Sequence, residues 1–270
     1  MAQLSVSKAW DDTREIFARD GSLIIAVALA LFVLPQIIVG LITVPGSGVM
    51  SVTGRIVWIA AALIGVIGQL AIVRLALGHT TVGDAIGHGA RRFLPTFGSL
   101  LLLGCALALI GIPVIVALLA GRIIEMPIEG QPPPPSFGVL ALAIALVSLL
   151  ISVKFTMIVP ISSEERAGPL QILKRSWNLS RGHYWRLLGF LLIVLVTAIV
   201  LAIVTQSVGG VIARLVGDRL APFTLGALLL ALIEALVSSA LTALFAVMAA
   251  RIYRQLAAGE AQASVPSSGT

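Results

Sequence analysis

Residues 187–208 read LLGFLLIVLVTAIVLAIVTQSV, a run of 22 residues that contains no charged side chain. A helix needs about 20 mostly apolar residues to cross the hydrocarbon core of a bilayer, and this run is long enough. Its apolar residues surround the whole helix instead of forming one stripe, as a helix embedded in a membrane requires. The segment therefore predicts a transmembrane helix.

Five further stretches satisfy the same rule. With the first one they give spans at 23–44, 56–77, 93–120, 137–160, 187–208 and 223–250. Hydrophobic residues make up 59% of the 270 residues and charged residues only 11%, against about 45–50% and 25% in soluble domains. A soluble fold has too little interior to bury so much apolar surface, so a soluble enzyme, a disordered chain and a secreted disulfide scaffold are all excluded. The sequence predicts an all-α membrane helix bundle over residues 23–256.

The basic residues indicate how the bundle is oriented. Thirteen Lys and Arg side chains fall on the side that holds both chain ends, and four fall on the other side. The positive-inside rule therefore predicts that both termini are cytoplasmic. The net charge of +6 is explained by topology and by anionic lipid headgroups, so no nucleic-acid partner is expected. The tail at 257–270 is small and polar, and we expect it to be disordered.

Each segment before an odd-numbered span predicts an amphipathic helix at the cytoplasmic interface. The first covers residues 1–22, and Gly21 is expected to end it. The second begins at Thr81–Asp84, which has the spacing of a capping box. These units, each an interfacial helix followed by two spans, also predict a threefold internal repeat.

The third interfacial segment is the most distinct. Ser162–Glu165 has capping-box spacing, Pro169 suits a first helical turn, and Gly182 suits the C-terminal cap. Glu164 and Glu165 are interpreted as charges at the helix N-terminus. One face is predicted to carry Leu170, Leu173 and Trp177, and the other to carry Gln171, Lys174, Arg175, Asn178 and Arg181.

Basic and aromatic residues gather around the end of this third helix. The surface consists of Lys174, Arg175, Arg181, Tyr184, Trp185 and Arg186. Two interpretations stay open. It is either an ordinary positive-inside anchor or a docking surface for anionic lipid headgroups or for a protein partner in the membrane.

One acidic residue, Glu234, lies inside a predicted span. A carboxylate within the membrane is energetically costly and is a functional hypothesis by default. Small residues recur every four positions on the same span, at Ala227, Ala231, Ala235, Ser239 and Ala243, and predict a close-packing seam that Glu234 borders. Glu234 is therefore predicted to face the bundle.

Ser238 and Thr242 follow Glu234 on the same side of the span, and Gln69 is its best-matched neighbour in depth. Three interpretations of Glu234 remain: a hydrogen-bonded structural carboxyl, a group coupled to protons or solute, or a residue near the outer interface. Lys154 is expected to extend towards the cytoplasmic surface instead of pairing with Glu234.

Common sequence motifs of nucleotide binding, metal binding and hydrolysis are missing from the sequence. There is no P-loop, HExxH, GxSxG or Cys/His cluster, so no cofactor, metal site or catalytic residue is predicted and the protein is not expected to be an enzyme. The single cysteine, Cys105, is expected to pack in the core.

Residues 153–188 read VKFTMIVPISSEERAGPLQILKRSWNLSRGHYWRLL. A span that ends in Pro, an acidic pair, Gly-Pro and then Arg-Ser-Trp-x-Leu-x-Arg-Gly-x-x-Trp-Arg resembles the glycerophosphoryl diester phosphodiesterase membrane-domain family. The resemblance implies a six-span module of the bacterial inner membrane in a lipid context. It does not imply phosphodiesterase activity, because in that family the activity resides in a separate barrel domain that is not expected here.

Two functions follow as hypotheses. The first is a non-catalytic inner-membrane protein that interacts with lipids, as a scaffold or a regulatory module. The alternative is a secondary transporter or small-solute permease that uses Glu234.

Overall fold

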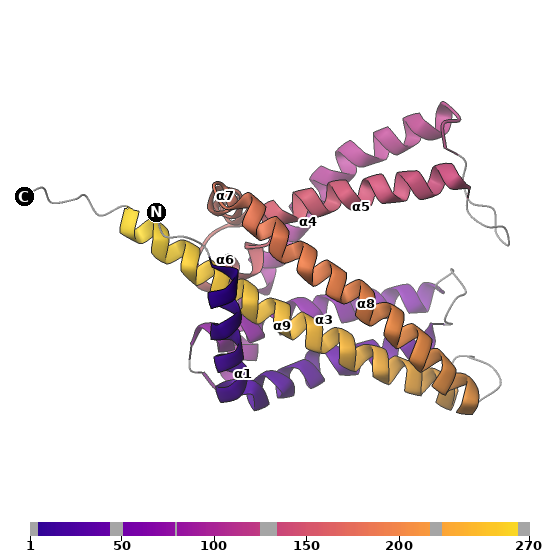
Figure 1. Cartoon of the computed structure of the whole chain (residues 1–270), viewed down its shortest axis with the longest axis horizontal. Helices are drawn as coiled ribbons and strands as arrows, with labels where there is room; N and C mark the ends of the chain where they lie inside the picture. The colour runs from indigo at the N-terminus through magenta and orange to yellow at the C-terminus, as the bar shows by residue number, and fades with distance from the viewer. Residues whose placement is uncertain (1–4, 44–50, 79, 125–133, 217–222, 264–270) are drawn as a thin grey trace, which may run out of the picture.

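The computed structural model describes residues 5–43, 51–78, 80–124, 134–216 and 223–263 (Figure 1). All of its regular elements within these ranges are helices, and six helical segments are long and apolar enough to cross a membrane. The predicted fold class, an all-α membrane helix bundle with six spans, is confirmed. The elements are α1 (Val6–Ala28), η1 (Leu29–Val33), α2 (Leu34–Ile42), α3 (Val52–Leu77), α4 (Val82–Ala120), α5 (Pro135–Phe155), α6 (Ile158–Glu164), α7 (Pro169–Ser180), α8 (Tyr184–Val216) and α9 (Leu225–Ala263).

Helix α9 organises the bundle because it packs against α1, α2, α3, α6 and α8. Helix α3 packs against α4, and α7 joins α4 to α5. The start of α1 lies across the long helices, and α1 begins at the same end of the bundle at which α9 finishes (Figure 1). Both ends of the described chain therefore lie on one side of the membrane, as an even number of spans requires.

The predicted seam on the sixth span is confirmed. Ala227, Ala231, Ala235, Ser239 and Ala243 are all buried. A Cβ added at Gly40 of α2 would lie 2.5 Å from the Cβ of Ala231, so the two backbones approach as closely as small residues allow. Span one is thereby held tightly against α9 at the level of Glu234.

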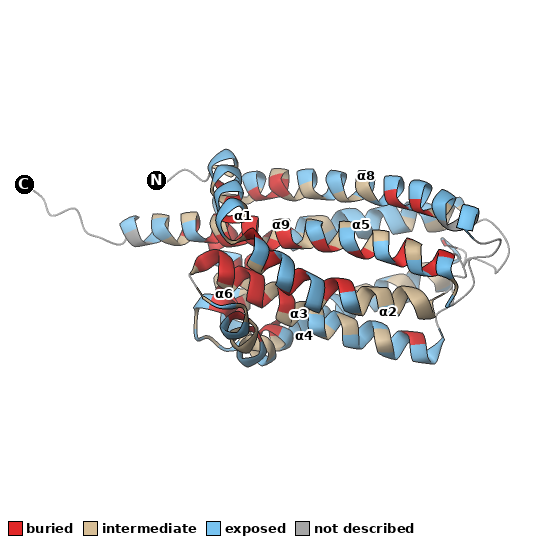
Figure 2. Cartoon of the chain, turned by 90° about the horizontal axis from the view of Figure 1, so that it is seen from below, coloured by how far each residue is buried: buried red, intermediate tan, exposed pale blue. Residues whose placement is uncertain are grey.

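The outward surfaces of α4, α5 and α8 are apolar and open. Leu109 on α4 is 78% exposed and Leu142 on α5 is 71% exposed, whereas buried residues gather towards the end of the bundle where α1 and α6 lie (Figure 2). Cys105, predicted to lie in the core, is exposed on α4. Such surfaces suit contact with lipid chains, which solvate apolar side chains without requiring burial in protein.

Three predicted boundaries are wrong, each because a helix continues further than expected. Helix α1 passes through Gly21 without a break, and Gly21 is buried in the packing of the bundle. The second interfacial segment is continuous with span three in α4, although Thr81 does cap it by accepting a hydrogen bond from the Asp84 N–H at 3.2 Å. Helix α9 extends to Ala263, so the tail is helical beyond Ala257; residues 264–270 lie outside the described ranges.

The start of the third interfacial helix also differs from the prediction. Ser162 lies inside the short helix α6, and α7 begins only after Gly168, whose N–H donates to the side chain of Gln171 at 3.2 Å. The capping box at Ser162 is therefore wrong. Gly182, by contrast, has a φ of +85°, which confirms its predicted place at the end of α7.

Candidate functional site: a polar cavity inside the bundle

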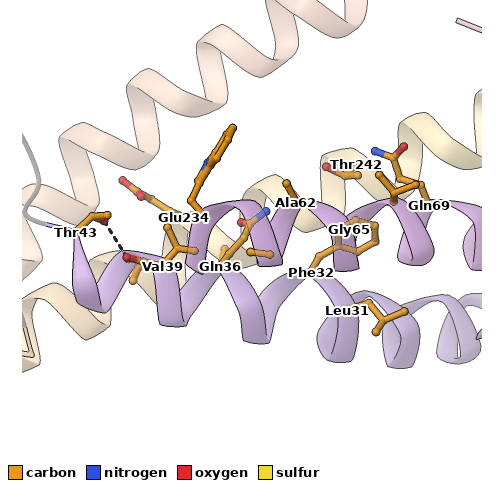
Figure 3. A pocket seen from close by; sticks show the side chains of 16 residues that line it. Leu31, Phe32, Gln36, Val39, Thr43, Ala62, Gly65, Gln69, Glu234 and Thr242 are labelled. Atoms are coloured by element: carbon orange, nitrogen blue, oxygen red, sulfur yellow. Dashed lines mark hydrogen bonds between the residues drawn. The ribbon is translucent and has the colours of Figure 1, made fainter. Parts of the chain in front are cut away.

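A cavity of about 450 Å³ lies between span one, α3 and α9, and Glu234 is in its wall (Figure 3). Thr43 marks one end, near Glu234, and Gln69 and Thr242 mark the other. The lining residues of α3 run from Trp58 to Gln69, which corresponds to about 16 Å along the helix axis. The cavity is therefore elongated along the membrane normal and begins nearer the side opposite the chain ends.

Span one is irregular where it lines the cavity beside α3. Residues Leu29–Val33 form the π-helix η1, followed by Pro35 in the first turn of α2. Proline within a helix is a common cause of a kink, and the π-helix gives the same stretch a wider turn. Leu31 and Phe32 of η1 line the cavity, and the ring of Phe32 packs on Gly65 and Gly68 of α3. Such π-helical turns occur frequently at functional sites.

Glu234, predicted to face the bundle, lines the cavity from α9. The side-chain amide of Gln206 on α8 donates a hydrogen bond to its Oε1. Glu234 also lines a second cavity, of about 160 Å³, which lies on the side of Gln206 and Gly40. Glu234 therefore stands between two adjoining spaces. Gln69, the neighbour predicted from depth, lines the main cavity, but the direct partner of Glu234 is Gln206.

The series of hydrogen-bonded polar side chains continues along α9 and across to span one. Ser238 donates a hydrogen bond to Oε1 of Gln36 at 2.6 Å, and Thr242 donates to the carbonyl of Ser238 at 2.8 Å. Gln36 and Thr242 line the cavity, whereas Ser238 acts by orienting the Gln36 amide. The four intramembrane residues predicted from sequence are thus brought to one region. Gln36 and Gln206 were missed.

The charge in the cavity wall has one sign. Among the described residues that line the main cavity, Glu234 is the only ionisable side chain at neutral pH, and the other polar groups are amides and hydroxyls. Trp58 adds an aromatic ring. An acidic group with uncharged hydrogen-bonding partners can accept a cation, and no cationic side chain lines the cavity to hold an anion.

One arginine of the predicted basic surface, Arg175, is already paired with carboxylates of the protein. Arg175 forms ion pairs with Glu165 at 3.2 Å and with Glu260 at 2.7 Å, and Glu165 also accepts a hydrogen bond from the Tyr253 hydroxyl at 3.0 Å. Burial alone would lower the pKa of Arg175, but the two carboxylates raise it above its ordinary value. Arg175 therefore ties α7 to α9, and Glu164, which pairs with Arg74, ties α6 to α3. The interpretation of the two glutamates as helix N-terminal charges is wrong.

The faces of α7 are also rotated from the prediction. Ile172, Ser176 and Leu179 are buried, and Ser176 donates to the carbonyl of Lys154 at 2.8 Å. Leu170 and Trp177 are exposed. The exposed face of α7 therefore combines apolar and basic side chains. From the predicted surface, Lys174 lies on it and Arg181 at its C-terminal end, while Trp185 and Arg186 are exposed at the start of α8.

Lys154, which was expected to extend towards the cytoplasmic surface, extends towards α7. Its Nζ lies 5.0 Å from the ring centre of Trp177 and 5.1 Å from that of Tyr184, a cation–π contact with two rings. The Tyr184 hydroxyl donates to the carbonyl of Leu150 at 3.1 Å. Tyr184 thus fixes the end of α5 instead of facing outward with Trp185, which is 79% exposed.

No cluster of three or more His, Cys, Asp or Glu side chains that could hold a metal ion occurs in the part of the chain that the structure describes. The fold and the site together define a multi-pass α-helical membrane protein with a cavity between its spans, whose lining includes one carboxylate and several amides and hydroxyls.

Within that class, the chain belongs to the family described as "Domain of unknown function (DUF7847)", whose model matches residues 4–256. The match covers all six membrane-spanning segments. No curated protein and no solved structure matches the chain. The resemblance of residues 153–188 to the glycerophosphoryl diester phosphodiesterase membrane domain stays a prediction, because the family match does not test it.

Proposed function

We propose that this protein is a secondary transporter or permease for a small cationic solute, with Glu234 as the group that binds the cation. The observation that carries the proposal is the single carboxylate in the wall of a 450 Å³ cavity inside the membrane bundle. Pockets of roughly 300–1,000 Å³ suit small ligands, and ionisable residues at membrane depth mark solute, ion and proton pathways.

The neighbours of Glu234 favour a cation that donates hydrogen bonds. Gln36, Gln69 and Thr43 supply oxygen acceptors along the cavity, and Trp58 offers an aromatic face to a positive charge. A primary or secondary organic amine meets all of these groups. An anionic solute would meet the carboxylate without a compensating cation in the described wall.

The surroundings of Glu234 also favour transport of a bound cation over its permanent retention in the cavity. The π-helix η1 and Pro35 give span one an irregular turn beside the cavity, and Glu234 faces a second space on its other side. A carboxyl in this position can release its proton when the cation binds and regain it when the cation leaves, so that charge is conserved at each step. We place the protein in a bacterial inner membrane with both termini cytoplasmic, in accord with the distribution of basic residues.

The experiment that tests this function is uptake of labelled small amines into vesicles that contain the purified protein. With a proton gradient directed out of the vesicles, we expect accumulation above that in protein-free vesicles, and no accumulation of carboxylates of equal size. If no amine is bound or transported at any gradient, the proposal fails.

A second candidate function, a lipid-interacting scaffold or regulatory module, is favoured by the exposed surface formed by α7 and the start of α8. Leu170 and Trp177 of α7 and Trp185 of α8 are exposed, as are Lys174 and Arg181. Apolar side chains that enter the headgroup region next to cations that meet its negative charge are typical of an interfacial helix. Arg175 does not contribute, because its charge is paired within the protein.

This second function predicts the effect of a double variant, Lys174→Gln with Arg181→Gln. Each cation near the surface contributes about 1 kcal/mol of attraction to anionic lipid, so retention of phosphatidylglycerol by the purified protein should fall by roughly tenfold or more. Native mass spectrometry of the protein with its bound lipids measures this retention. The matched control is Arg14→Gln, an exposed arginine on α1, which should leave retention unchanged. Equal retention by the double variant and the control would exclude a lipid-docking role for α7.

A further inference from the structure

A third cavity, of about 350 Å³, lies at the end of the bundle where the chain begins and ends. Helices α1, α3 and α9 pack against one another there and form its walls (Figure 1). Five ionisable side chains line it: Asp12, Glu15 and Arg19 from α1, and Arg251 and Arg254 from α9. This cavity is separate from the Glu234 site, which none of these residues lines.

The charges in this wall are largely unpaired. Asp12, Glu15, Arg251 and Arg254 form no ion pair within the described ranges, and Arg19 is paired with Asp20 at 2.8 Å. The Nε–H of Arg251 is buried and has no hydrogen-bond partner among the residues that the structure places. A buried donor without a partner is costly, and a ligand that accepts its hydrogen bond would remove that cost.

The depth of the cavity matches that of lipid headgroups. Arg251 follows directly after the apolar stretch of the sixth span, Arg19 precedes the apolar stretch of the first span by one turn, and Leu77 is the last residue of α3. All three helices therefore leave the hydrocarbon region at this level. Basic pockets between membrane helices at such a level bind phosphate-bearing headgroups.

The presence of both positive and negative side chains in the cavity wall limits which class of ligand can bind. Guanidinium groups bind phosphate oxygens through two parallel hydrogen bonds, which fits Arg251 and Arg254. The carboxylates of Asp12 and Glu15 would repel a purely anionic group but would accept hydrogen bonds from an ammonium. We propose that this cavity binds a zwitterionic phosphoethanolamine group, either as the headgroup of phosphatidylethanolamine or as the free compound. The arginines would hold the phosphate and the carboxylates would hold the amine.

The test compares lipids with identical acyl chains on the purified full-length protein by native mass spectrometry. We expect phosphatidylethanolamine to bind about tenfold or more tightly than phosphatidylcholine, whose quaternary ammonium cannot donate hydrogen bonds to Asp12 or Glu15. Arg251→Gln should weaken phosphatidylethanolamine binding by about tenfold or more. Arg254→Gln, at an exposed position that tolerates change, should weaken it in the same direction if Arg251→Gln does not fold.

Controls separate this site from the α7 surface and distinguish the two sources of the ligand. The Lys174→Gln and Arg181→Gln double variant should bind phosphatidylethanolamine as the unchanged protein does. Displacement of the lipid by excess free phosphoethanolamine would assign the site to a soluble compound, and its failure to displace the lipid would assign the site to the membrane lipid. Equal binding of the two lipids, or binding that survives both arginine variants, would overturn the proposal.

Discussion

Glu234→Gln is expected to weaken binding of small amines by about 30-fold or more and to abolish their proton-driven uptake. Gln keeps the shape of Glu and can still bond to the Gln206 side chain, so the bundle should fold as before. What is lost is the negative charge, and removing one partner of a desolvated charge pair costs about 2–5 kcal/mol. Binding to the purified variant and uptake into vesicles measure the two effects separately.

The matched control for this prediction is Glu260→Gln, which makes the same chemical change on the same helix but outside the cavity. Glu260 pairs with Arg175, which retains Glu165 as a partner, and partly exposed ion pairs contribute only about 0–1 kcal/mol. Amine uptake by the Glu260 variant should therefore match that of the unchanged protein. Normal amine uptake by the Glu234 variant would leave its carboxyl with a structural role only.

Gly89→Ala should destabilise the bundle by about 1–3 kcal/mol, because α3 and α4 cross at this residue without room for a side chain. A Cβ at position 89 would lie 2.7 Å from the carbonyl oxygen of Ile67 and 3.4 Å from the amide nitrogen of Ala71. Both atoms belong to the backbone of α3, so the two helices would have to separate. The unfolding midpoint in detergent should fall by several degrees, at roughly 2–4 °C per kcal/mol.

Gly83→Ala provides the comparison, since it is the same substitution six residues earlier on α4. Gly83 is exposed, and a Cβ there meets no atom within 4 Å. Ala also has a helix propensity about 1 kcal/mol better than that of Gly, so this variant should be as stable as the unchanged protein or more stable. If the two variants unfold at the same temperature, the described packing of α3 on α4 is incorrect.

The sequence predicted the bundle well because membrane spans follow a simple physical rule. Any segment of about 20 apolar residues is stable across the bilayer, so six spans and the small-residue seam of α9 could be found without knowledge of tertiary contacts. Helix ends were harder to predict. The continuation of α1 through Gly21 and of α9 to Ala263 depends on packing at the end of the bundle, which no local pattern encodes.

The candidate site was predicted only in part, for a different reason. Glu234 stood out because a carboxylate interrupts an apolar span, but Gln36 and Gln206 are uncharged and do not lower the hydropathy of their spans enough to attract notice. A search for every amide within a span would have found them. That Gln206 meets Glu234 is a property of the packing of α8 on α9.

The prediction of the basic surface was also limited, because contacts between distant parts of the sequence could not be foreseen. Arg175 was assigned to the lipid surface because its neighbours are basic, yet its partner Glu260 lies 85 residues later in the chain. The predicted faces of α7 failed because Ser176 and Ser180 are polar but buried, where their hydroxyls bond to the carbonyl of Lys154 at the end of α5. Hydropathy cannot show that a polar side chain has found a buried partner.

Cysteine labelling tests whether the cavity beside Glu234 is open to water from the side opposite the chain ends, as transport of a cation through it requires. In a chain whose native thiol is removed by Cys105→Ser, Ala62→Cys places a thiol in the cavity wall, and Ala60→Cys places one at an exposed position of α3 outside it. We expect that a hydrophilic thiol reagent labels the position 62 variant from that side, that a bound amine protects it, and that the position 60 variant, which faces lipid, stays unlabelled. Equal labelling at the two positions, or no labelling at position 62, would rule out a water-filled route to Glu234 from that side.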